Sequence, residues 1–205
     1  MALADYVPVI CFAIASVILM CDLYNKMSKW AFALFAAGAV DIISAGGLKA
    51  TYKLLYAAGV CDFEPLNAMF FPVQSIGFLL AGIGVLLMLL DKKHKGTAAL
   101  AVAPPLFKGT FIFVGFMVAG IGILDTFLSI ISVKMKKPWL IAIFVLSFVC
   151  SLGMGYLSTK DFAKASMNWI AEGVNVVGQG ALLAGVYLMH KNGLAELSLD
   201  GDEAQ

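Results

Sequence analysis

The sequence predicts an all-α integral membrane protein with six transmembrane helices, arranged as two halves of three. Of its 205 residues, 61% are hydrophobic and only 13% are charged. A soluble domain carries roughly 25% charged residues. The apolar residues gather in runs long enough to cross a bilayer as helices, which takes about 20 residues. Similar landmarks also recur in the two halves of the chain, which indicates an internal repeat.

Six apolar runs follow one another along the chain, separated mostly by short connections that contain lysine, such as NKMSK and KMKK. The expected spans cover residues 6–24, 30–48, 66–90, 107–133, 139–157 and 167–189. The longer connection 49–65 is either a helix extension or an amphipathic interfacial segment. The other, 96–108, contains Pro-Pro, which stops a helix. We predict that 96–108 links the halves 1–95 and 109–192, and that the acidic tail 193–205 is disordered.

The two halves share a pattern that indicates duplication. YNKMSKW at 24–30 resembles SVKMKKPW at 132–139. Along the third span of each half, the aligned pairs are Asn67 with Asn168, Gln74 with Asn175 and Gly77 with Gly178. Because three is an odd number, a copy that follows directly lies upside down, as in the inverted repeats of many transporters. If 96–108 crossed the membrane the repeats would be parallel, but its Pro-Pro and its shortness argue against this.

Charge excludes some functions. The net charge is +1, which gives no electrostatic footprint for nucleic acid. All 14 basic residues are lysine, so no bidentate guanidinium clamp for phosphate is available. The absence of arginine suggests an AT-rich bacterial genome, and we expect the protein in the bacterial cytoplasmic membrane. On the six-span prediction, eight lysines lie on one side and six on the other, an excess that favours an external N-terminus.

The sixth span contains the most informative pattern. Asn168, Glu172, Asn175 and Gln179 lie at i, i+4, i+7 and i+11, on one face of a helix. We call these four residues the polar stripe. Polar groups are expensive in lipid, so the stripe is expected to face protein or water. It predicts either one wall of a solute pathway or interhelical hydrogen bonds that hold the bundle together.

The third span has a shorter version of the stripe. Asn67 and Gln74 are seven residues apart on one face, and the repeat would place them opposite the polar stripe. Two walls that bear amides suit a small polar solute that both donates and accepts hydrogen bonds. The predicted pathway is therefore lined by Asn67, Gln74, Asn168, Glu172, Asn175 and Gln179.

Acids inside the spans are the next candidates. Asp41 and Asp125 lie within the second and fourth spans, and neither has an acidic counterpart in the other half. With Glu172, they are predicted to provide ion coupling or selectivity. The alternative is that each acid pairs with a lysine from a span end, such as Lys49 or Lys108. Asp22, at the end of the first span, is expected at the membrane interface.

The sequence lacks the residues that several kinds of chemistry require. There are only two histidines, both at span ends, and no mid-span lysine lies in the sixth helix for a Schiff base. The four cysteines form no C-x-x-C, and no hydrolase, zinc-protease or P-loop motif occurs. We therefore predict no cofactor, no metal site and no enzymatic activity.

The predicted function is a transporter or channel for a small polar solute or ion, embedded in the lipid bilayer. The alternatives are a partner or assembly subunit whose polar stripe binds another helix, and an intramembrane enzyme that uses acid pairs. The sequence leaves open whether the chain forms a homo-oligomer.

Overall fold

The computed structural model describes residues 3–90, 110–157 and 165–198, and all regular structure in these ranges is helical. The long helices are α1 (Tyr6–Leu23), α2 (Lys29–Ala57), α4 (Phe70–Leu90), α5 (Thr110–Lys134), α6 (Leu140–Leu157) and α7 (Ala165–Lys191). The short helices are η1 (Tyr24–Lys26) and α3 (Glu64–Ala68). Each predicted apolar run corresponds to one long helix. The connection 49–65 begins as a helix extension, because α2 continues to Ala57.

Five helical segments are long and apolar enough to span a membrane by length and composition. They are Tyr6–Lys26, Lys29–Ala57, Glu64–Leu90, Ile112–Lys134 and Leu140–Leu157. Helix α7 is long enough but is not among them, because the polar stripe lowers its hydropathy. Helix α7 packs in the same bundle as these five segments, so it experiences the same surroundings. We therefore assign it to the same bundle of membrane type.

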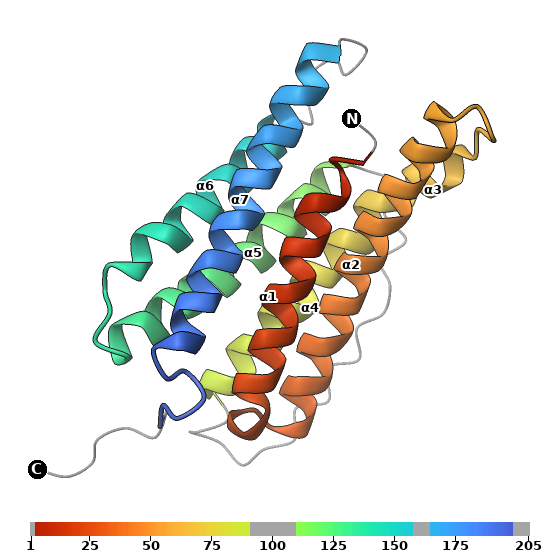
Figure 1. Ribbon diagram of the computed structural model, residues 1–205. Helices are drawn as coiled ribbons and strands as arrows, with labels where there is room; N and C mark the ends of the chain where they lie inside the picture. Colours follow the sequence, from red (N-terminus) through yellow and green to blue (C-terminus); the bar gives the residue numbers. More distant parts are fainter. Residues whose placement is uncertain (1–2, 91–109, 158–164, 199–205) are drawn as a thin grey trace, which may run out of the picture.

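The six long helices form a closed ring. Helix α1 packs on α2, α2 on α4, α4 on α5, α5 on α6, α6 on α7, and α7 returns to α1 (Figure 1). The first and last helices of the chain therefore lie side by side. We call the end of the bundle at which α1 begins the upper end and the opposite one the lower end, as they are drawn in Figure 1.

Contacts between neighbouring helices fix the direction of each. At the upper end Lys49 lies over the ring of Phe70, while lower down a Cβ on Gly84 would meet Phe35. Helix α4 therefore descends beside the ascending α2. In the second half, a Cβ on Gly155 would be 3.7 Å from Val114, and Ser132 lies 3.9 Å from Met189 at the lower end. Helix α5 therefore also descends.

The predicted inverted arrangement is wrong for these helices. Helices α1, α2 and α4 run down, up and down, and α5, α6 and α7 repeat the same directions (Figure 1). Helix α4 therefore ends at the lower end of the bundle, and α5 begins at the upper end. The predicted linker 96–108 lies outside the described residues. Hydropathy could not show that the second half has the same orientation as the first, because a helix has the same composition in either direction.

The outer surface of the ring is apolar. On α1, exposed side chains recur at helical spacing at Val7, Ile10, Ile14 and Val17. On α6, Val145, Leu146, Val149 and Leu152 are likewise exposed. Soluble monomers rarely expose contiguous apolar surfaces of this kind. Exposed tryptophans lie towards both ends of the bundle, Trp30 and Trp139 at the lower end and Trp169 nearer the upper end, as expected for membrane–water interfaces.

The lower half of the bundle is tightly packed. The largest fully buried side chains all belong to it: Leu23, Phe35, Val85, Met88, Phe127, Leu128, Ile131, Leu140, Phe144, Val186, Met189 and Leu194. Leu194 belongs to the predicted disordered tail, but it is completely buried, and Lys26 donates a hydrogen bond to the carbonyl of Ala195. The tail was therefore predicted to begin too early, because residues 193–198 pack against the lower end.

Asp22 joins α1 to α7 at this end. It is buried within the bundle near the end of α1, and both of its carboxyl oxygens lie within 3.0 Å of His190 Nδ1. His190→Ala is expected to destabilise the protein by about 1–2 kcal/mol, because it leaves a buried carboxyl without its partner while His190 itself is half exposed. Adding Asp22→Asn is expected to restore part of this loss. Thermal unfolding in detergent of both single variants and the double variant measures the coupling, and strictly additive losses would contradict it.

Candidate functional site

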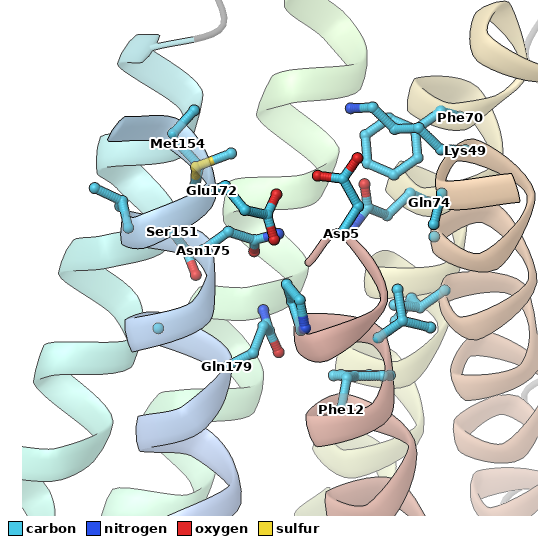
Figure 2. Close-up of a pocket in the computed structure, with 18 of the residues that line it drawn as sticks. Asp5, Phe12, Lys49, Phe70, Gln74, Ser151, Met154, Glu172, Asn175 and Gln179 are labelled. Carbon is cyan, nitrogen blue, oxygen red and sulfur yellow. The ribbon is translucent and has the colours of Figure 1, made fainter. Parts of the chain in front are cut away.

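A cavity of about 420 Å³ lies inside the ring, in its upper half (Figure 2). All six long helices contribute to its walls. Its volume falls within the range of about 300–1,000 Å³ that is usual for small-molecule sites. Its upper rim includes Asp5 and Lys53, and its deepest residues include Phe12, Phe78 and Ile121. Below these residues the packed lower half begins.

The polar stripe lines the cavity. Asn168, Glu172, Asn175 and Gln179 all contribute to the lining from α7, and Gln74 contributes from α4 on the opposite side. In Figure 2, Glu172, Asn175 and Gln179 face Gln74 and Lys49 across the space. Asn67 belongs to α3, and its side chain lies outside the described part of the structure. Of the six predicted pathway residues, the structure therefore brings five together.

Among the described residues, four charged groups lie at the rim of the cavity, and sequence reasoning did not combine them. Lys53 Nζ lies 2.8 Å from Asp5 Oδ2, and Lys49 Nζ lies 3.7 Å from the centre of the Phe70 ring. Asp5 also lies within hydrogen-bonding reach of the Glu172 carboxyl group, and the charges of Lys53 and Lys49 act on that group as well. We call Asp5, Lys49, Lys53 and Glu172 the rim charges. One signal in the sequence pointed to two of them, because Lys49 and Lys53 are four residues apart and so share a helix face.

A side-chain contact holds this rim together. Tyr6 and Thr51 share a hydrogen bond of 2.7 Å between their hydroxyl groups, and this joins the start of α1 to the upper part of α2. The contact holds Asp5, which directly precedes α1, close to Lys53 on α2. Asp5 is buried, while the Lys53 side chain is 34% exposed and reaches solvent. The charged rim is therefore the part of the cavity that is closest to water.

Two buried oxygens that α7 contributes to the cavity wall have no hydrogen-bond partner among the described residues. Within the described residues, neither Glu172 Oε1 nor Gln179 Oε1 accepts a hydrogen bond. Glu172 is only 9% exposed. A buried acceptor without a partner is unfavourable by about 1–3 kcal/mol. Both atoms are therefore available to a bound solute that donates hydrogen bonds.

The other two predicted acids lie outside the cavity. Asp125 is 4% exposed, and in the described part of the chain neither carboxyl oxygen has a hydrogen-bond partner of good geometry. The hydroxyl of Ser147 on α6 lies near this carboxyl group. Asp125 is one helical turn below Ile121, which lines the cavity. Asp41 is partly exposed on α2, beside Gly77 of α4.

Comparison with known proteins finds no family model, no curated protein and no solved structure that matches this chain. In the described ranges, no three His, Cys, Asp or Glu side chains come together as a metal site requires. What the geometry defines is a helical bundle of membrane type with a solute-sized cavity in its upper half. The function has to be argued from that cavity.

Proposed function

We propose that this protein is a carrier for a small polar organic solute in a bacterial cytoplasmic membrane, with the cavity as its solute site. The observation that supports this most is the contrast between the two halves of the ring. The upper half contains a polar cavity, and the lower half is filled by large side chains that are fully buried. A site accessible from one side and closed on the other is what one state of an alternating-access carrier requires.

An open channel is the less favoured form of the transport hypothesis, because a channel needs a continuous wet path. Residues such as Phe35, Phe127 and Phe144 fill the lower half, with at most 2% of each exposed. The partner-subunit alternative expected the polar stripe to face lipid until another helix covers it. In this bundle the stripe faces the cavity, so it is not available on the outer surface for a partner helix.

Asp125 is the proposed coupling residue. It lies between the solute cavity and the closed lower half, and an unpaired acid inside a membrane bundle marks a functional site by default. Opening the lower half would have to separate the helices around this carboxyl. A proton or cation that binds there in only one state would link its own movement to that of the solute. Asp41, which is partly exposed and remote from the cavity lining, is a weaker candidate for this role.

Purified protein in liposomes provides the test. We expect saturable uptake of at least one small polar organic solute, measured with and without a pH gradient. Glu172→Gln is expected to reduce this uptake at least tenfold, because it removes the only charge of the polar stripe. Asp125→Asn is expected to retain exchange of solute between the two sides but to lose accumulation driven by the gradient.

Matched exposed acids provide the controls. Glu64→Gln, on the exposed α3, should transport like the wild type, and all variants should elute as folded protein in detergent. Ion currents that do not saturate would contradict the carrier form and favour a channel. Absence of uptake of every solute class by folded protein would contradict the transport function.

A further inference from the structure

The rim charges balance, which limits the charge of a ligand that the cavity can accept. Asp5 and Glu172 oppose Lys49 and Lys53, so the four groups together are formally neutral. In a partly desolvated site, a ligand with a net charge would leave that charge uncompensated, and this is unfavourable. A ligand that is neutral overall preserves the balance. It is either uncharged or a zwitterion.

Two of the rim charges form an ion pair with each other and the other two do not. This difference distinguishes a zwitterionic ligand from an uncharged one. Asp5 and Lys53 form an ion pair of 2.8 Å with each other. Lys49 forms no ion pair with any residue that the structure describes, and its ammonium group rests on the ring of Phe70. Glu172 keeps one buried oxygen without a partner. The cavity therefore offers one available cation and one available carboxyl oxygen, the latter beside the Asp5 carboxyl group.

These two groups lie on different walls. Lys49 belongs to α2 and Glu172 to α7, and Figure 2 shows them on either side of the space, with Asp5 between them. A ligand that bridges them needs an anionic end for Lys49 and a donor-bearing cationic end for Glu172. Gln179 Oε1, deeper on α7, is a further acceptor for the same cationic end or for an amide N–H.

Below the rim, the lining becomes apolar. Phe12, Phe78, Met117 and Ile121 are among the residues that line the deeper part of the cavity. They can hold a hydrocarbon or aromatic body, but they offer it no hydrogen bonds. An apolar body that extends below a doubly charged head group matches this division between rim and floor.

We propose that the cavity binds a small zwitterion with an apolar body, its carboxylate against Lys49 and its ammonium group against Glu172. This is the chemistry of a neutral amino acid. The inference rests on the proposed function, because it names the solute class of the same cavity. It goes beyond that function by assigning opposite ends of the ligand to two particular side chains.

Equilibrium binding to the full chain in detergent micelles tests the assignment without requiring transport. The probes are leucine, phenylalanine, 6-aminohexanoate and glycine betaine. Each amino compound is compared with its matched amine and its matched carboxylate, for example isoamylamine and 4-methylpentanoate for leucine. We expect at least one zwitterion to bind roughly ten- to a hundredfold more tightly than either of its singly charged relatives, since each lost charged hydrogen bond accounts for about this factor.

Variants then test the two ends separately. Lys49→Met is expected to weaken the zwitterion and to bring the matched amine to a similar affinity, because the group that selects the carboxylate is gone. Glu172→Gln is expected to bring the matched carboxylate closer to the zwitterion instead. A purely structural role would weaken all three probes together. Lys134→Met and Glu64→Gln, both at exposed positions outside the cavity lining, serve as matched controls.

Each outcome supports or overturns the assignment. If no zwitterion binds more tightly to the wild type than its singly charged relatives, the proposal is overturned, whether or not the variants fold. If both variants weaken all probes equally, the assignment of the two ends is overturned. Zwitterion binding without uptake in liposomes would overturn the transport function but support the ligand class. Uptake of another solute without zwitterion binding would support transport but overturn the ligand class.

Discussion

Gly120→Ala is expected to destabilise the bundle by about 1–3 kcal/mol, although alanine is ordinarily the better helix former. The reason is the contact between α4 and α5. A Cβ on Gly120 would overlap backbone atoms of Phe78, and a Cβ on Gly82 would lie 2.8 Å from the carbonyl oxygen of Gly120. Backbone cannot move aside as a flexible side chain does, so the two helices would have to separate. The melting temperature in detergent is expected to fall by several degrees.

Gly115 provides the matched control, because it lies on the same helix and a Cβ there meets nothing within 4 Å. Gly115→Ala is expected to be neutral or to stabilise the protein by up to about 1 kcal/mol. The two substitutions make the same chemical change, so opposite signs would isolate the close approach of the helices. Equal effects of the two substitutions would contradict the α4–α5 contact.

The connections 49–65 and 134–139 are expected to face opposite sides of the membrane. The inverted arrangement predicted from the sequence would place both on one side. In the structure, α2 ends at the upper end and α5 ends at the lower end. Cys61, which is exposed after α2, is a natural reporter once the other three cysteines are replaced. Lys134→Cys, in a version without Cys61, reports on the other connection.

The distribution of lysine between the two ends of the bundle predicts which end faces the cytoplasm. Among the described residues, six lysines lie at the lower end, namely Lys26, Lys29, Lys134, Lys136, Lys137 and Lys191, and only Lys49 and Lys53 lie towards the upper end. By the positive-inside rule, we expect the lower end to face the cytoplasm. A membrane-impermeant maleimide should therefore label Cys61 in intact cells, and should label Lys134→Cys only after permeabilisation. Labelling of both positions from the same side would contradict the parallel order of the two halves.

The two AGIG segments show what a local sequence pattern can predict about helix packing and what it cannot. AGIG occurs in the third and fourth predicted spans, and the sequence analysis could only match it to close helix packing in general. In the structure these segments lie in α4 and α5 and pack against each other through Gly82 and Gly120. Composition indicated that backbones approach there. It did not indicate which helix was the partner, because every apolar helix offers a similar surface.

The candidate site likewise contains residues that the sequence predicted and residues that only the fold brought together. The polar stripe was predictable, because its four members lie on one helix and obey one period. Gln74 was found by analogy between the halves, and that pairing across the cavity holds even though the inverted arrangement does not. The rim charges were not assembled from the sequence, because they come from α1, α2 and α7, which meet only when the ring closes. The sequence singled out Asp125 as an acid within an apolar span, but its place below the cavity followed only from the fold.

The sequence by itself determined the helices and their approximate ends, the apolar outer surface and the face of α7 that is polar. These properties depend on residues close together in the chain, through hydropathy and helical period. Only the tertiary structure decided that α4 and α5 run in parallel, that α1 lies beside α7, and that a cavity opens above a packed half. Those features depend on which apolar faces fit together most closely. Backbone contacts such as that between Gly120 and Phe78 determine this fit, and they join residues that are distant in the chain.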